Sequence, residues 1–176
     1  MIETIISSKT RVKLLLKFFL NSKTKGYLRG LEEEFGESSN AIRLELNKFE
    51  KSGMLKSFVQ GNKKFFQANV NHPLFNEIHN LIIKHIGFDQ IIENVLEKLG
   101  DINQAYVLGD FAKGKDNPVI DLMLIGNINK IYLVELIEKA EKIIDRRIRY
   151  IIYDRLENVA WNLVEIDSLL LWDKLD

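Results

Sequence analysis

Cysteine is absent from the 176-residue chain, and histidine and proline are scarce, with three and two residues. Without cysteine the chain can form no disulfide and offers no thiolate to a metal, and three histidines provide little for a zinc site. A run of 18 apolar residues is also missing, which argues against a membrane-spanning helix. The first residues lack the charged-then-apolar pattern of a signal peptide. These absences predict a cytoplasmic protein that binds no membrane and holds no metal.

Apolar and charged residues are plentiful, and the charges are unevenly distributed. Hydrophobic residues make up 46% of the chain, which is enough for a packed core. Residues 1–70 hold 13 Lys or Arg and 7 Asp or Glu, a net charge of +6, whereas residues 71–176 hold 12 and 18, a net charge of −6. We interpret this division as two modules with different partners. The positive charge of the first module predicts that it binds a polyanion.

Residues 38–52 predict a helix. Ile42, Leu46 and Phe49 lie four and three positions apart, which places them on one helical face. Two serines precede the first turn as capping residues, and Gly53 follows the last turn.

The flanking segments predict the rest of this module. Shorter helices are expected over residues 9–20 and 27–35, and Gly36 is placed to end the second in a left-handed conformation. Two β-prone runs, residues 54–59 and 63–68, surround a Gln-Gly-Asn turn and predict a hairpin. Helix, short turn, capped helix and hairpin is the order of a winged helix-turn-helix.

The polar side of the helix over residues 38–52 has side chains that suit DNA. Cations on phosphates supply most of the affinity for DNA, and side chains at base edges supply specificity. The predicted DNA-binding residues are Ser38, Ser39, Asn40, Arg43, Asn47 and Lys48, with Lys63 and Lys64 at the hairpin. The alternatives are that these are solvated helix residues and that the module contacts protein. Leu44 lies beside Arg43, near the predicted DNA face.

Residues 8–70 resemble the winged helix-turn-helix regulators of the arsenic-repressor-like class. The matching stretches are AIRLELNKFEKSGML and VQGNKKFFQAN. The resemblance implies double-stranded DNA as a partner and a homodimer on a palindromic site. The thiolates that sense metals in such regulators cannot exist here, because the chain has no cysteine.

The rest of the chain alternates helices and strands, which is typical of an α/β domain. Helices are predicted over residues 74–86, 88–99 and 131–145, and strands over residues 102–108, 119–125 and 147–153. Residues 156–175 are compatible with a helix, and residues 169–172 within them with a short strand.

The predicted fold is therefore an α+β protein of two modules. A winged helix-turn-helix occupies residues 1–70, connecting helices occupy residues 71–100, and a small α/β domain with a mixed sheet occupies residues 101–176.

Residues 107–126, VLGDFAKGKDNPVIDLMLIG, resemble the minimal nucleotidyltransferase domains of the polymerase-β-like superfamily. Those domains have a strand, a Gly-Ser turn, a short helix, and then a strand with two acidic residues one position apart. A later strand supplies a third acid. Carboxylates are needed there because phosphoryl transfer uses two metal ions that they hold.

The chain departs from that family pattern at three positions. Gly109 and Asp121 match the family glycine and the second acid, but Asp110 replaces the serine. The position of the first acid is Val119, and the position of the third falls near Arg149. The resemblance therefore implies one family carboxylate out of three.

Three interpretations of this domain stay open. It is a catalytically inactive nucleotidyltransferase-like domain with a ligand pocket, an active enzyme that uses Asp110 and Asp121, or an unrelated α/β domain. If the last two strands are neighbours, Arg149 should face Asp121. The candidate pocket residues are Gly109, Asp110, Lys113, Asp121 and Arg149.

The combined prediction is a DNA-binding transcription regulator. Its inactive nucleotidyltransferase-like domain would sense a nucleotide-like effector or form the dimer contact, with no catalytic residue and no cofactor. One alternative is an active nucleotidyltransferase that transfers a nucleotidyl group to a nucleic acid or protein acceptor and uses Mg²⁺. Another is an interaction protein, such as an antitoxin-like partner, that forms a stable hetero-complex without binding DNA.

Overall fold

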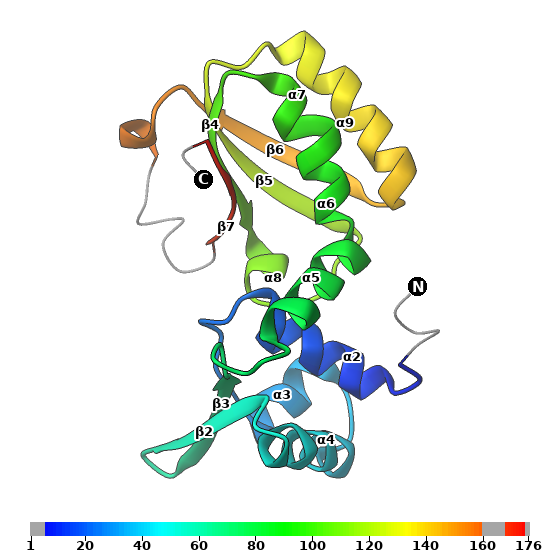
Figure 1. Cartoon of the computed structure of the whole chain (residues 1–176), viewed down its shortest axis with the longest axis vertical. Helices are drawn as coiled ribbons and strands as arrows, with labels where there is room; N and C mark the ends of the chain where they lie inside the picture. Colours follow the sequence, from blue (N-terminus) through cyan, green and yellow to red (C-terminus); the bar gives the residue numbers. More distant parts are fainter. Residues whose placement is uncertain (1–5, 160–167, 175–176) are drawn as a thin grey trace. The chain divides into compact units, whose positions relative to one another are not determined.

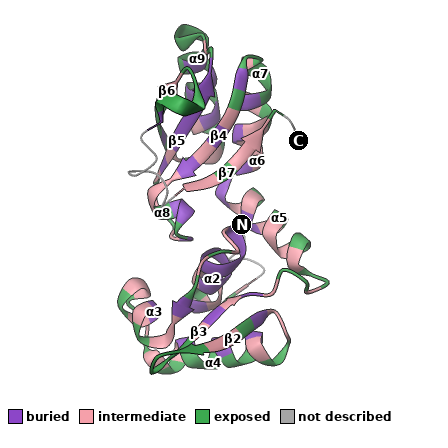
Figure 2. Cartoon of the chain, turned by 90° about the vertical axis from the view of Figure 1, so that its left-hand side faces the viewer, coloured by how far each residue is buried: buried purple, intermediate pink, exposed green. Residues whose placement is uncertain are grey.

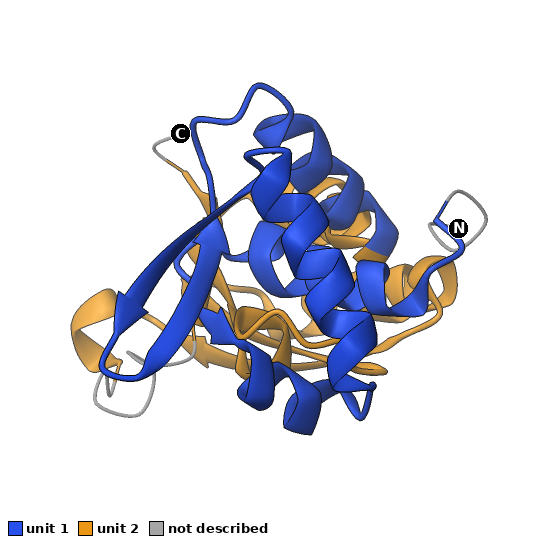
Figure 3. Ribbon diagram, turned by 90° about the horizontal axis from the view of Figure 1, so that it is seen from below, with its two compact units in different colours: residues 1–85 blue, residues 86–176 orange. Residues whose placement is uncertain are grey.

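The computed structural model describes residues 6–159 and 168–174. The chain divides into two compact units, unit 1 over residues 1–85 and unit 2 over residues 86–176 (Figure 3). It is a mixed α+β protein with a mixed sheet. No helix among the described residues is long and apolar enough to cross a membrane.

Unit 1 combines helices with a small antiparallel sheet of strand order β1-β3-β2 (Figure 1). Its elements in chain order are α2 (Lys9–Leu15), the π-helical turn η1 (Leu16–Leu20), β1 (Gly26–Tyr27), α3 (Leu28–Phe35), α4 (Ser39–Lys51), β2 (Leu55–Gln60), β3 (Lys63–Ala68) and α5 (Phe75–Ile86), whose last residue lies at the unit boundary.

Local sequence explains where these helices begin and end. Ser8 accepts a hydrogen bond from the Arg11 backbone N–H and caps α2. Ser38 caps α4 in the same way. Gly36 ends α3 with a φ of 63°, as the sequence predicts. The predicted helices and hairpin of this unit are confirmed. Strand β1 was not predicted, because it has only two residues and forms through its pairing with β3.

The core of unit 1 lies between its helices and its sheet. Helices α2 and η1 supply fully buried leucine and phenylalanine side chains, and α3 and α4 add Leu31, Ile42 and Leu46. Helix α5 joins this unit through Phe19: the Phe75 ring lies 5.7 Å from the Phe19 ring, and His79 Nδ1 is 2.7 Å from the Phe19 carbonyl oxygen. The sequence had placed this segment among connecting helices.

Unit 2 is built on a four-stranded sheet of order β6-β5-β4-β7. Strands β5 and β6 are parallel, and the other pairs are antiparallel. The elements in chain order are α6 (Phe88–Ile91), the π-helical turn η2 (Ile92–Leu96), α7 (Glu97–Leu99), β4 (Ile102–Leu108), α8 (Gly109–Ala112), β5 (Val119–Gly126), α9 (Lys130–Ile144), β6 (Arg147–Tyr153), the 3-10 turn η3 (Leu156–Asn158) and β7 (Ser168–Asp173).

Helices α6, α7 and α9 cover one face of the unit 2 sheet (Figure 1). Buried residues accordingly run along β4 and β5 and in the helices that cover them (Figure 2). The opposite face has a smaller apolar cluster of Met123, Ile125 and Val159. Successive side chains of a strand point to opposite faces of the sheet. Asp121 and the residues that share its face therefore lie on the side of the sheet away from the main core.

Two predictions for unit 2 are refined. The short helix expected from Phe111 begins at Gly109 instead, because the φ of 64° at this glycine already turns the chain out of β4. Within residues 156–175, the short strand is confirmed over the wider range of β7, while residues 160–167 lie outside the described part of the chain.

We predict that Gly87→Ala lowers the free energy of unfolding more than Gly36→Ala does. Both glycines are in the left-handed helical region, with a φ of 92° and 63°, so both variants bear similar backbone strain. A Cβ at Gly87 would lie 2.6 Å from Ile144 Cγ2, whereas nothing lies within 4 Å at Gly36. The difference should be about 1–3 kcal/mol, the usual cost of overpacking. Urea unfolding measures it, and equal losses would show that this contact does not constrain the fold.

Candidate functional site

The predicted DNA-binding residues of α4 do not form one exposed face. Ser38 is occupied as a helix cap, its Oγ 3.2 Å from the Ala41 backbone nitrogen. Arg43 and Asn47 line a cavity between α4, the start of α3 and the β2–β3 hairpin. Ser39 and Asn40 lie in the first turn and do not line it. Leu44 remains 53% exposed beside them.

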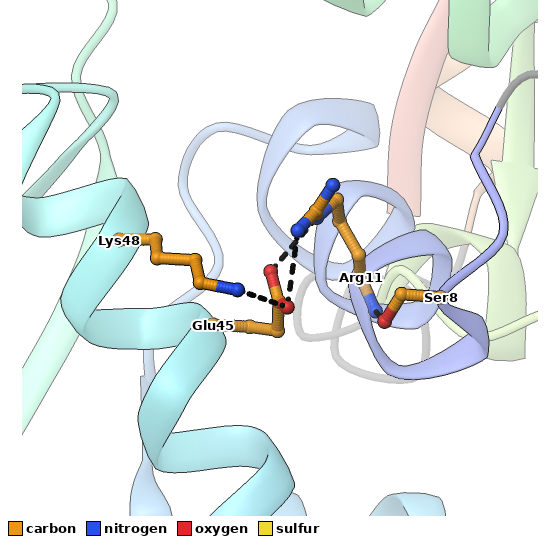
Figure 4. Close-up of polar contacts among 4 residues, drawn as sticks. All are labelled: Ser8, Arg11, Glu45 and Lys48. Atoms are coloured by element: carbon orange, nitrogen blue, oxygen red, sulfur yellow. Dashed lines mark hydrogen bonds and ion pairs between the residues drawn. The ribbon is translucent and has the colours of Figure 1, made fainter.

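Lys48 belongs to an ion-pair network between α2 and α4 (Figure 4). Arg11 donates from Nε to Glu45 Oε2 at 2.8 Å and from Nη2 to Oε1 at 3.1 Å, and Lys48 Nζ donates to Oε1 at 3.1 Å. Glu45 is only 8% exposed. The Arg11 hydrogen bond lowers the pKa of Glu45 more than burial raises it. The network ties α4 to α2 and uses a cation that was assigned to DNA.

The hairpin lysines also contact protein groups. Lys64 Nζ lies 2.8 Å from Glu50 Oε2 and, together with the hydrogen bond from Ser57 to Glu50, lowers the pKa of that carboxyl. Lys63 Nζ lies 4.1 Å from the centroid of the Tyr27 ring. Both lysines line the same cavity as Arg43 and Asn47.

In unit 2, the parallel pairing of β5 and β6 places Asp121 directly opposite Arg149. The guanidinium donates from Nε to Oδ1 at 2.7 Å and from Nη2 to Oδ2 at 2.9 Å, so the predicted contact is confirmed. This hydrogen bond, together with the carboxylate charge, raises the pKa of Arg149. Both side chains are reachable from solvent, at 32% exposure for Asp121 and 72% for Arg149.

Gly109 brings the end of β4 next to this pair. A Cβ on Gly109 would lie 3.6 Å from Asp121 Oδ2. Gly109, Asp121 and Arg149 line a shallow depression of about 350 Å³, together with Tyr150 and Ile151. The sequence prediction did not include these two apolar side chains, although their position directly after Arg149 on the same strand was a usable signal.

The other carboxylates of the loop after β4 are also held by protein groups. Asn117 Nδ2 donates to Asp110 Oδ2 at 2.7 Å, and Arg146 Nη1 donates to Asp116 Oδ1 at 2.8 Å. Asp110 and Lys113, both predicted for the pocket, do not line the depression.

The two metal ions that the nucleotidyltransferase resemblance implies do not fit these residues. Val119 has no oxygen to offer, and Arg149 places a cation where a third carboxylate would stand. Within residues 6–159 and 168–174, no group of three or more metal-ligating side chains is found. A pair of divalent ions needs several carboxylates to offset its charge.

Comparisons with known proteins give only distant likenesses. No family model matches the chain, and no curated protein matches it. One similar solved structure is a tri-AMPylated Shewanella oneidensis HEPN toxin in complex with MNT antitoxin, at 16% identity and a TM-score of 0.39, over 52% of this chain and 74% of that one. A toxin–antitoxin structure with AMP-PNP has 18% identity and a TM-score of 0.40, over 49% and 73%.

The prediction of a DNA-binding transcription regulator is wrong. The similar solved structures are of toxin–antitoxin proteins that include an MNT antitoxin, and neither is described as a transcription regulator or as bound to DNA. The side chains agree, because Lys48 and Lys64 are paired with Glu45 and Glu50 and because Arg43 lines a concave cavity.

We predict that Glu45→Gln lowers the free energy of unfolding by about 1–3 kcal/mol near pH 7, because Arg11 loses a charged partner. The folded-state pKa of Glu45 is below its usual 4.5, so the stabilisation is complete above that value and is lost as the pH falls through the lowered pKa. Unfolding of both proteins in urea at several pH values measures this. The exposed Glu33→Gln is the control, and a difference that persists in acid would contradict the ion-pair account.

Proposed function

We propose that the chain is a nucleotidyltransferase-like protein whose unit 2 binds the phosphates of a nucleotide at the depression beside Arg149, without two-metal chemistry. The observation that carries the proposal is the exposed, two-pronged pair between Arg149 and Asp121. Where the nucleotidyltransferase resemblance implies several carboxylates, this chain has one ion pair with no net charge. The guanidinium of that pair lies beside Gly109 and is available to bind phosphate.

An arginine suits this role because of its shape and its hydration. The planar guanidinium matches phosphate oxygens and is more weakly hydrated than an ammonium ion. Arg149 uses Nε and Nη2 for Asp121, which leaves the N–H groups of Nη1 as donors for a ligand. Tyr150 and Ile151 supply apolar surface beside it, at 38% and 46% exposure. A phosphate on the guanidinium and a base on these side chains would use both halves of the depression.

Active nucleotidyl transfer is the second candidate function. It is favoured by the position of two carboxylates around one turn, since Asp110 follows Gly109 and Asp121 lies against it. Asp121 is already bound by Arg149, and Asp110 by Asn117. These partners are the reason that binding without transfer is the first candidate.

Two further predictions belong with this proposal. The order of helices in unit 1 and its β1-β3-β2 sheet support a winged-helix arrangement. The module boundaries at residues 70 and 100 stay a prediction, and the compact units divide at residue 85 instead. The homodimer also stays a prediction, and light scattering after gel filtration measures it.

We predict that Arg149→Ala weakens ATP binding about tenfold or more, the order of magnitude of one charge-assisted hydrogen bond. Arg147→Ala is the matched control, since it removes the same charge two positions earlier on the same strand, where the side chain is 81% exposed and paired with Glu141. Calorimetric titration with ATP in EDTA measures both variants. If both variants weaken ATP binding equally, the effect comes from the overall charge of the protein, and a site at Arg149 is contradicted.

Adding Mg²⁺ and radiolabelled ATP to the same proteins separates the two candidates. We expect no transfer of label to the chain or to added acceptors. Mg²⁺-dependent transfer that Asp121→Asn abolishes would contradict the first candidate and establish the second.

A further inference from the structure

The cavity of unit 1 has an unusual concentration of positive charge. It has a volume of about 540 Å³ and is lined by four cations, which are Arg29, Arg43, Lys63 and Lys64. Two amides, Asn47 and Asn62, add hydrogen-bond donors. Among the described residues that line it there is no Asp or Glu. Four like charges around one cavity repel one another unless an anion lies between them.

The two arginines are the least satisfied of these cations. Lys64 is paired with Glu50, and Lys63 lies over the Tyr27 ring. The side chains of Arg29 and Arg43 have no hydrogen bond and no ion pair with any residue in the ranges 6–159 and 168–174. Their guanidinium groups are exposed and therefore ready for a ligand.

The inner wall of the cavity is apolar and well defined. Leu46 and Phe66 are 1% and 5% exposed and form buried surface behind the cations. The Tyr27 ring lies against the first turn of α3 because residue 30 is glycine, where a Cβ would lie 2.9 Å from Tyr27 Cε1. The ring also packs edge-on against Phe65. Lys63 Nζ lies over the ring at 4.1 Å from its centroid, so Tyr27 forms a fixed wall that positions this lysine at the cavity.

We infer that this cavity binds a small molecule with a chain of linked phosphates, of the chemical class of nucleoside polyphosphates. Its volume is in the range of small-molecule sites, about 300–1,000 Å³. Three negative charges on such a ligand would offset Arg29, Arg43 and Lys63, because Glu50 already balances Lys64. The α3 helix starts here with no side-chain cap and no acidic residue in its first turn, which adds the positive end of its dipole. This site is separate from the depression at Arg149 in unit 2.

The test is an NMR titration of the full ¹⁵N-labelled chain with sodium tripolyphosphate, ATP or adenosine, in EDTA and at constant ionic strength. We expect tripolyphosphate and ATP to shift the backbone amide signals of Leu28, Arg29, Asn47 and Asn62, and adenosine to leave them unchanged. Tighter binding of ATP than of tripolyphosphate would assign the ligand to nucleotides, and equal binding would assign it to inorganic polyphosphate. If only the amide signals of residues near Gly109 and Arg149 shift, the inference about the unit 1 cavity is overturned and the unit 2 proposal still holds.

Matched variants make the location testable. Lys63→Gln lies inside the cavity and Lys56→Gln is an exposed lysine of the same hairpin outside it. Lys63→Gln should weaken tripolyphosphate binding about tenfold or more, and Lys56→Gln less than about twofold. Arg43→Gln should match Lys63→Gln, and it leaves folding unchanged because Arg43 has no partner to lose within the described residues. Equal effects of Lys63→Gln and Lys56→Gln would overturn the site. Displacement of tripolyphosphate by a duplex oligonucleotide at a lower phosphate concentration would also overturn it.

Discussion

The register of one pair of parallel strands governs the chemistry of unit 2. Because β5 and β6 pair with Asp121 opposite Arg149, the two side chains meet on the same face of the sheet. A shift by one residue would turn Arg149 to the other face and place Ile148 or Tyr150 beside the carboxylate. The apolar residues that alternate with this pair prevent such a shift, because Ile120, Leu122 and Ile148 are buried under the helices.

The same pairing changes what the site can bind. In a two-metal site, carboxylates attract divalent cations, and the cations attract phosphates. Here the guanidinium supplies the positive charge directly, and the loop before β5 continues the pattern with Arg146 on Asp116 and Asn117 on Asp110. In the proposed function, unit 2 binds phosphate through Arg149 while protein groups neutralise the acids that metals would need.

Unit 1 shows the complementary arrangement. Its network of Arg11 and Lys48 around the buried Glu45 connects α2 to α4. Four other cations, Arg29, Arg43, Lys63 and Lys64, line one cavity, and the side chains of Arg29 and Arg43 have no protein partner among the described residues. Part of the net charge of +6 over residues 1–70 therefore lies on one concave basic surface.

The sequence predicted the helices, the strands other than β1 and one contact correctly. It did not predict that lysines assigned to DNA form ion pairs with glutamates of the protein. Periodicity and capping located α4, the hairpin and the strands of unit 2, because Ser38, Gly36 and Gly61 act locally. Counting positions also placed Arg149 against Asp121. It could not show that Glu45 is buried against Arg11 or that Glu50 holds Lys64, because those partners are far apart in the chain. A polar helical face therefore predicted DNA binding, although the side chains turn to protein groups and to a cavity.

The central claim is that Arg149 takes the place of a metal centre, and electron paramagnetic resonance of Mn²⁺ tests it most directly. Wild-type protein should leave the signal of free Mn²⁺ unchanged. The double variant Val119→Asp with Arg149→Asp should reduce that signal, because it restores carboxylates around Asp121. Binding of Mn²⁺ by the wild type, lost in Asp121→Asn, would show that the metal displaces Arg149 and would contradict the account.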